Sequence, residues 1–141
     1  MILFICSQSF LRSRTAELLC CLGGVEARCA GTDKNALYKV NDELLTSAQY
    51  IFCMEKRHLK EIASMPGFDR RRAVVLNIPD DYVRFDPELV DSLIKRTASF
   101  DEEIARAMKL GWLRHQAMQH IALDDESEAN PAPTPGIRPG A

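Results

Sequence analysis

The sequence predicts an α/β fold built on a parallel sheet, and two adjoining features near its start carry this prediction. The apolar run at 2–5 is followed by a polar loop and by residues 15–22, which have helical composition and end at two glycines. Residues 25–29 then alternate apolar and polar side chains, as a strand with one covered face does. Strand, loop, helix and strand in this order are the parts of a βαβ unit, in which both strands run parallel.

Length and composition limit the number of domains and the classes of function that this chain can have. The chain has 141 residues, enough for one domain, because a domain of this size buries roughly two-thirds of the surface that its unfolded chain exposes. Its formal net charge of −2, with both signs mixed, gives no general electrostatic reason to bind nucleic acid or a membrane. The five cysteines show no paired zinc-type spacing, and the apolar start is too short for a signal or membrane segment. We therefore expect a reduced, cytoplasmic protein.

The alternation of strands and helices continues along the chain. Each further element is predicted from an apolar run with β-type residues or from a capping residue before an apolar stripe. The predicted elements are a helix capped by Asn41 and running to Ala48, a strand at 50–54, a short helix at 55–63, a strand at 73–78 that Pro79 ends, and a helix that Asp86 and Pro87 begin.

A last helix and a tail complete the chain. The segment Ser99-Phe-Asp-Glu102 has the spacing of a capping box, which predicts a helix from Phe100 to about Leu123. The apolar content that follows is too low to offset the entropy of ordering the chain. We therefore expect one domain over residues 1–123, which includes this extra helix, and a disordered tail over residues 124–141.

The segment from Cys6 to Ser13, Cys-Ser-Gln-Ser-Phe-Leu-Arg-Ser, carries the functional prediction. Between a buried strand and a helix, backbone N–H groups and the helix N-terminus converge on one point and form an anion site. The helix dipole, the Arg12 charge and the Ser13 hydroxyl all favour an ionised sulfur on Cys6. Five intervening residues let the loop encircle a phosphate while Arg12 grips two of its oxygens. A buried cysteine beside a surface arginine has the same spacing, so the prediction depends on the strand and helix that flank the loop.

Several segments, in order over about the first two-thirds of the chain, match a known family. They are Ile2-Leu-Phe-Ile-Cys-Ser7, Leu11-Arg-Ser13 with Thr15-Ala-Glu17, Ala30-Gly-Thr32, Ile51-Phe-Cys-Met-Glu-Lys-Arg-His58, and Val75-Leu-Asn-Ile-Pro-Asp-Asp-Tyr82 with Asp86-Pro-Glu-Leu89. In this ordered set the chain resembles the low-molecular-weight protein tyrosine phosphatases, especially a short bacterial subgroup. The resemblance implies a four-stranded parallel sheet flanked by helices, the three-layer phosphotyrosine phosphatase I-like fold.

The resemblance also implies hydrolysis of a phosphate monoester in two steps, through a phosphocysteine and with no metal or other cofactor. Cys6 would attack phosphorus, and Arg12 with the loop amides would stabilise the equatorial oxygens. The expected substrate is a phosphotyrosine protein or a small aryl phosphate. The substrate-binding residues it implies are Ser7, Gln8, Ser9, Phe10, Leu11 and Ser13 in the loop, and Tyr82 as an aromatic wall.

Three aspartates compete for the role of the general acid that protonates the leaving oxygen. Asp86 and Pro87 imitate the family's Asp-Pro signature, but N-capping explains this pair fully. In the family the acid directly follows the last strand and precedes an aromatic residue, and Asp80 before Tyr82 fits that description. We assign the acid to Asp80. Asp81 is the alternative, because a short turn could rotate either carboxylate inward.

Departures from the family keep other functions open. Gln8 stands where the family usually has glycine, and Ser9 stands where it has asparagine, which tolerates left-handed backbone more readily. Leu11 replaces a second cysteine that could protect the nucleophile as a disulfide. The alternatives are a weakly active or non-catalytic module that binds phosphate or phosphotyrosine, and a phosphoarginine phosphatase. An arsenate reductase fits less well, because no cysteine follows Cys53 to resolve a disulfide.

The remaining notable residues have structural interpretations. The oligomeric state is left open by the sequence. We expect buried packing for Cys20 and Cys21, a solvated turn at Arg70-Arg-Arg72, surface or capping roles for His58, His115 and His120, and either core packing or partner docking for Met108, Trp112 and Leu113.

Overall fold

Four parallel strands form the centre of the structure, a computed structural model that describes residues 1–9 and 11–129. They lie in the order β2-β1-β3-β4, and the register places Phe4 of β1 between Cys29 and Phe52. The parallel four-stranded sheet confirms the predicted fold class. The strands are β1 (Ile2–Cys6), β2 (Ala27–Gly31), β3 (Tyr50–Cys53) and β4 (Ala73–Val75).

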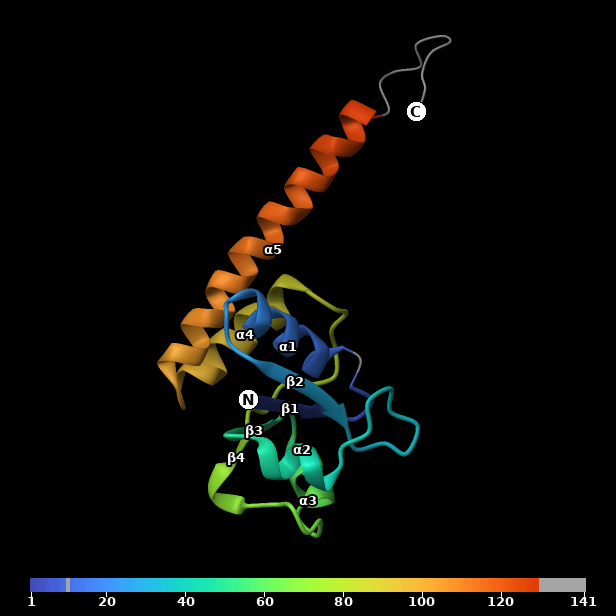
Figure 1. Cartoon of the computed structure of the whole chain (residues 1–141), viewed down its shortest axis with the longest axis vertical. Coiled ribbons are helices and arrows are strands. Elements are labelled where there is room, and N and C mark those ends of the chain that lie inside the picture. The colour runs from blue at the N-terminus through green and yellow to red at the C-terminus, as the bar shows by residue number, and fades with distance from the viewer. Residues whose placement is uncertain (10, 130–141) are drawn as a thin grey trace.

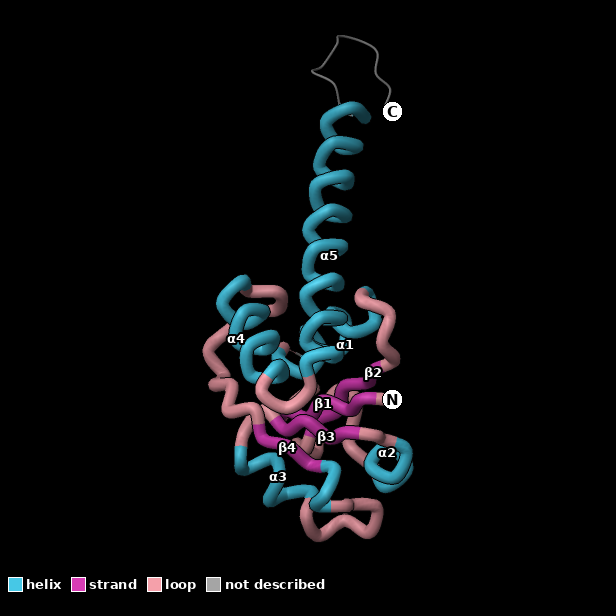
Figure 2. Tube along the Cα trace, turned by 90° about the vertical axis from the view of Figure 1, so that its left-hand side faces the viewer, coloured by secondary structure: helices cyan, strands magenta, loops and turns pink. Residues whose placement is uncertain are grey.

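Helices cover both faces of this sheet (Figures 1 and 2). Every residue of β1 is buried, with Phe4 and Cys6 on the face under α1, α4 and α5, and Leu3 and Ile5 on the face under α2 and α3. A strand covered on both faces needs a continuous apolar run, which is what the sequence has there. The helices are α1 (Arg12–Leu22), α2 (Asp42–Ser47), α3 (Lys56–Ile62), α4 (Pro87–Ala98) and α5 (Glu102–Ala129), with a 3-10 turn, η1 (Arg70–Arg72).

Side-chain caps set the starts of several helices. The carboxamide of Asn41 and the carboxylate of Asp86 each accept a backbone N–H from the first turn of α2 and α4 at 2.9 Å, which confirms both predicted caps. The predicted cap of the last helix was wrong. Asp101, not Ser99, accepts the N–H of Ile104 at 3.0 Å, because Ser99 still has helical backbone angles at the end of α4.

The last strand and the last helix differ in length from the predictions. β4 ends at Val75 because Asn77 adopts a left-handed φ of 58°, yet the N–H of Ile78 still donates to the Met54 carbonyl at 2.8 Å. α5 continues to Ala129, so residues 124–129 of the predicted tail are helical. Their alanine and glutamates favour a helix that has already begun. The rest of the predicted tail, residues 130–141, lies outside the described residues.

α5 packs closely on α1. At Gly111 a side chain would clash with the carbonyl oxygen of Leu19 and would lie 2.8 Å from its carbonyl carbon, so the two helices approach to backbone contact. Of the helices in the described part of the chain, none combines the length and hydropathy that crossing a membrane requires.

Two interpretations of single residues change. Cys20 is fully buried and burial raises its pKa to about 12, but Cys21 is exposed because it lies on the outer side of α1. Arg72 is not simply solvated, since it donates to the carbonyl of Thr46 at 3.0 Å and to that of Ala48 at 2.7 Å. It therefore ties η1 to the end of α2.

Candidate active site

The sulfur of Cys6 lies at the carboxyl end of β1, facing the first turn of α1. The backbone N–H of Ser9 donates to Sγ at 3.2 Å, and the hydroxyl of Ser13 lies 2.9 Å from it. Both contacts come from the loop and the helix start that the sequence places around an anion site. The Ser9 N–H is a donor aimed at the sulfur, whereas in the contact with Ser13 either atom can be the donor.

Ser9 shapes this loop by taking the conformation that asparagine would take more readily. Its φ is 56°, in the left-handed region, and its side chain is fully buried. Its hydroxyl accepts the N–H of Tyr38 at 2.8 Å, and the N–H of Asp33 donates to the Ser7 carbonyl at 2.8 Å. The chain after β2 thus braces the loop, and Ser9 supplies a side-chain link in the place of an asparagine amide.

Two hydrogen-bond acceptors hold the Nη1 end of the Arg12 guanidinium. Its side chain is only 2% exposed, and Nη1 donates to the Glu55 carboxylate and, at 2.8 Å, to the Ile78 carbonyl. Nε lies 3.7 Å from Oδ1 of Asp80, whose side chain is 57% exposed. Because both strong bonds use Nη1, the Nε side of the guanidinium points toward Asp80 and the open side of the site.

Glu55 is the residue that sequence reasoning missed. Its pKa falls to about 2, because Arg57 and then Arg12 donate hydrogen bonds to the carboxylate and outweigh its partial burial. A glutamate that follows a strand next to β1 in a parallel sheet lies at the same edge as Cys6, and that position was a usable signal. Its role as partner of Arg12 was visible only after folding.

His58 links Glu55 to the loop and confirms the expected capping role. Its Nδ1 accepts the backbone N–H of Glu55 at 3.0 Å, so the proton of the neutral ring lies on Nε2, which donates to the Ser7 hydroxyl at 3.1 Å. Burial, helped by the charges of Arg12 and Arg57, lowers the His58 pKa to about 4. The ring therefore stays neutral near pH 7 and keeps this hydrogen-bond pattern.

These groups surround a pocket of about 280 Å³, and the residues that line it are Cys6, Ser7, Gln8, Leu11, Arg12 and Asp80. Ser9 and Ser13 are buried and contact the sulfur of Cys6. The pocket therefore unites the expected nucleophile, arginine and acid with three of the expected substrate-binding residues.

Other expected site residues lie elsewhere. Tyr82 is absent from the pocket lining and packs, half buried, against the core under α1 and α4. It turns inward because the segment that follows it is tied to α1, where the N–H of Phe85 donates to Thr15 at 3.3 Å. Neither Asp81 nor Asp86 lines the pocket, and Asp86 is used as a cap. Phe10 lies outside the described residues.

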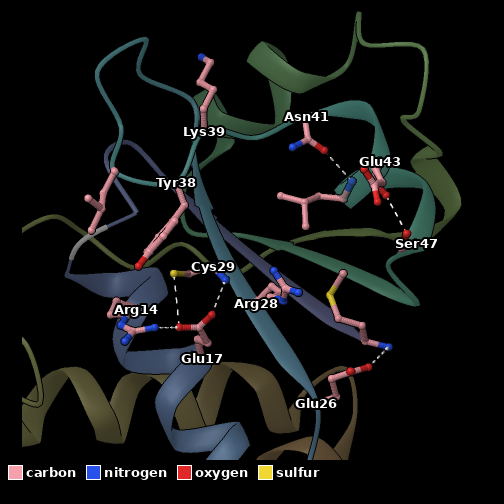
Figure 3. Close-up of a pocket in the computed structure, with 13 residues that line it drawn as sticks. Arg14, Glu17, Glu26, Arg28, Cys29, Tyr38, Lys39, Asn41, Glu43 and Ser47 are labelled. Carbon is pink, nitrogen blue, oxygen red and sulfur yellow. Dashed lines mark hydrogen bonds and ion pairs between the residues drawn. The ribbon is translucent and has the colours of Figure 1, made fainter.

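A larger pocket of about 860 Å³ lies along the open edge of β2 (Figure 3). Its inner charges are already matched: Glu17 pairs with Arg14 and accepts the backbone N–H of Cys29 at 3.1 Å. Burial, with the neighbouring Glu17 carboxylate, raises the Cys29 pKa to about 12, so this thiol is a poor nucleophile. The smaller pocket at Cys6 is therefore the candidate active site.

Comparison with known proteins supports the fold assignment. No protein-family model and no curated protein sequence matches the chain. Among solved structures, the tyrosine phosphatase Wzb from Escherichia coli K30, in complex with phosphate, has a TM-score of 0.54 and 24% identity over 77% of this chain and 90% of that one. A low-molecular-weight protein tyrosine phosphatase from T. tengcongensis has a TM-score of 0.54 and 16% identity over 77% and 95%.

A third similar structure is the arginine phosphatase YwlE of Bacillus subtilis, in a form with a phosphorylated active-site serine. Its TM-score is 0.50 and its identity 21%, over 76% of this chain and 91% of that one. The chain therefore has the fold of the low-molecular-weight protein tyrosine phosphatases, as its sequence motifs predict.

Proposed function

We propose that this protein is a cysteine-dependent phosphatase that hydrolyses phosphate monoesters, with phosphotyrosine in proteins as its main substrate. One observation carries the proposal. The Cys6 sulfur accepts the Ser9 N–H at 3.2 Å and lies 2.9 Å from the Ser13 hydroxyl, in the same small pocket as Arg12 and Asp80. A nucleophile, an anion cradle and a proton donor within one pocket are the groups that phosphoryl transfer requires.

In the first step the Cys6 thiolate attacks phosphorus, the S–P bond forms, and the bond to the leaving oxygen breaks. Asp80, at the pocket rim, gives its proton to that oxygen. In the second step the Asp80 carboxylate takes a proton from water, the water oxygen attacks phosphorus, and the S–P bond breaks. The products are an alcohol or phenol, inorganic phosphate and the regenerated thiolate.

Arg12 stabilises the phosphoryl group in both steps. Glu55 and the Ile78 carbonyl hold Nη1, which fixes the guanidinium plane and leaves the opposite edge for two phosphate oxygens. Because Asp80 is largely exposed, its carboxylate can turn from Nε toward the leaving oxygen when phosphate occupies the pocket. Glu55 is thus a positioning residue.

Two observations bear on substrate. Leu11 gives the pocket an apolar side suited to a phenyl ring, which favours an aryl phosphate. Phosphoarginine is the second candidate, because a protein with this fold is an arginine phosphatase and because the exposed carboxylate of Asp80, in the pocket lining, suits a guanidinium leaving group. A nucleophilic thiolate needs a reducing compartment, so the proposal includes a cytoplasmic location.

The test is steady-state hydrolysis of p-nitrophenyl phosphate, a phosphotyrosine peptide and a phosphoarginine peptide. Cys6→Ser should lower kcat by at least about 10³-fold, because a serine without a nearby base is a poor nucleophile, while phosphate still binds. The matched control is Cys21→Ser, which changes an exposed thiol of α1 and should leave kcat unchanged. Wild-type rates in Cys6→Ser would refute the mechanism, and phosphate binding without turnover in the wild type would leave a binding module.

A further inference from the structure

The backbone of the loop after β1 is held from one side, by the segment that follows β2. The Ser7 carbonyl accepts the N–H of Asp33 at 2.8 Å. The Gln8 carbonyl accepts the N–H of Leu37 at 3.2 Å. In a planar trans peptide the C=O and the next N–H point in opposite directions, so the N–H groups after these two carbonyls point away from that segment. The second of them, that of Ser9, reaches the sulfur of the nucleophile at 3.2 Å.

The side chain of Ser7 is held from the opposite side, by His58 of α3. Its hydroxyl accepts the proton of Nε2 in that ring at 3.1 Å. The strand order β2-β1-β3 explains the arrangement, because Asp33 follows β2 and α3 follows β3, on either side of β1. Ser7 is therefore fixed from two sides, through its carbonyl and through its hydroxyl.

The same ring also reaches the anchor of Arg12. Nδ1 of His58 accepts the backbone N–H of Glu55 at 3.0 Å, and the Glu55 carboxylate accepts a hydrogen bond from Nη1 of Arg12. A neutral imidazole suits this position, since it carries one acceptor and one donor on a rigid ring. The ring is fully buried, so a lost hydrogen bond would leave a polar group without a partner and without water. His58 therefore connects the two parts of the anion site, the loop and the arginine.

The surroundings of His58 keep its ring neutral. Burial is the main reason that its pKa falls to about 4, and the positive charges of Arg12, from α1, and of Arg57 act in the same direction. The carboxylates of Glu55 and Glu61 oppose this shift and have smaller effects. Protonation would place an N–H on Nδ1 against the backbone N–H of Glu55, so the connection persists only above about pH 4.

We propose that His58 is a positioning residue of the phosphate site, which acts by holding Ser7 and Glu55 in one hydrogen-bonded unit. The inference rests on the proposed function, since it assigns His58 to the same site. The loop amides and the Arg12 guanidinium then face one phosphoryl group in a fixed relation, and no reorientation is needed as charge develops on its oxygens. Loss of the hydrogen bond between His58 and Ser7 should weaken phosphate binding and catalysis together, because both use these donors.

The first test compares the Kd of inorganic phosphate, from calorimetry, with kcat/KM for p-nitrophenyl phosphate. His58→Asn keeps an acceptor for the Glu55 N–H but is too short to reach Ser7, and Ser7→Ala removes the same hydrogen bond from its other end. Each variant should raise the phosphate Kd and lower kcat/KM about two- to twelvefold, as the loss of one neutral hydrogen bond does. The double variant should be no worse than either single variant, since all three lack the same bond. Effects that multiply in the double variant would overturn the proposal.

Ile62→Val is the matched control, because Ile62 is a buried residue of α3 that packs in the core between the sheet and α2 and α3. It should lower Tm and leave the phosphate Kd and kcat/KM unchanged. If His58→Asn lowered Tm but changed neither functional measurement, its role would be that of Ile62 and the proposal would be overturned. Ser7→Ala, which changes a half-buried loop residue, decides the question if His58→Asn does not fold.

The second test observes the ring itself, by NMR of the imidazole nitrogens at neutral pH. In the wild type the proton of His58 should lie on Nε2, and it should exchange with water more slowly than in Ser7→Ala. A proton on Nδ1, a charged ring, or equal exchange rates in the two proteins would contradict the proposal.

Phosphate binding and the ring signals are both measured without turnover, which separates this inference from the proposed function. A wild type that binds phosphate but hydrolyses no phosphate monoester would refute the proposed function and not the role of His58 in positioning the site. A wild type that binds no phosphate would overturn both.

Discussion

The pairing of Glu55 with Arg12 leads to a quantitative prediction about positioning. Glu55→Gln keeps the shape of the side chain and one acceptor oxygen but removes the charge. A hydrogen bond to a charged partner contributes about 1.5–3 kcal/mol and a neutral one about 0.5–1.5, so the loss is about 1–1.5 kcal/mol. This corresponds to a decrease in kcat/KM of roughly five- to twelvefold. Glu55→Ala removes the hydrogen bond from Arg12 altogether and should lower kcat/KM roughly 10- to 150-fold.

The assay is kcat/KM for p-nitrophenyl phosphate together with the inhibition constant of phosphate. In the Glu55 variants kcat/KM should fall and the inhibition constant of phosphate should rise, because Arg12 is less well oriented toward the phosphoryl oxygens.

The contribution of Glu55 to the stability of the fold has a defined pH dependence. The Glu55 pKa is lowered from an ordinary 4.5 to about 2, so its ionised form stabilises the fold above pH 4.5 and this contribution is lost as pH falls toward 2. The difference in free energy of unfolding between wild type and Glu55→Gln should therefore shrink over that interval.

Glu61→Gln is the matched control, since Glu61 is an exposed glutamate of α3, the helix that Glu55 immediately precedes. It should change neither kcat/KM nor phosphate inhibition by more than about twofold, as expected for an exposed charge. If Glu55→Gln behaved like Glu61→Gln in both measurements, the conclusion that Glu55 positions Arg12 would be refuted.

Three further predictions concern the acid, the arginine and the packing of α5. Asp80→Asn should lower turnover of phenyl phosphate by about 10²–10⁴-fold and that of p-nitrophenyl phosphate less, because an acidic leaving group needs no proton. Asp86→Asn should be nearly inert, since asparagine caps α4 equally well, and the opposite pattern would identify Asp86 as the acid. Arg12→Lys should lose most activity, because an ammonium cannot make the planar two-pronged contact; activity within about threefold of wild type would contradict this. Gly111→Ala should lower Tm by roughly 3–10 °C, since the new methyl group clashes with the backbone of α1, and an unchanged Tm in calorimetry would contradict that close approach.

Much of the fold and part of the site could be predicted from the sequence, because the relevant energies are local. Burial on both faces requires the apolar run of β1, and Asn41 and Asp86 cap helices through residues two or three positions away. The nucleophile loop is local in the same sense, since Cys6 and Ser13 are joined by one strand-loop-helix turn. Such contacts involve neighbouring residues, so a pattern in the sequence is enough to indicate them.

Tertiary packing alone decided the remaining features of the site, because the contacts that form them join residues far apart in the chain. Glu55 meets Arg12 only because β3 pairs with β1 and their carboxyl ends share one edge of the sheet. Ser9 can keep a left-handed backbone because Tyr38, from the segment after β2, donates to its hydroxyl. Tyr82 turns into the core because the segment after it is anchored on α1. The sequence by itself therefore determined the parallel sheet and the phosphate loop, whereas long-range packing determined which side chains orient Arg12, since only folding brings those groups within hydrogen-bond distance.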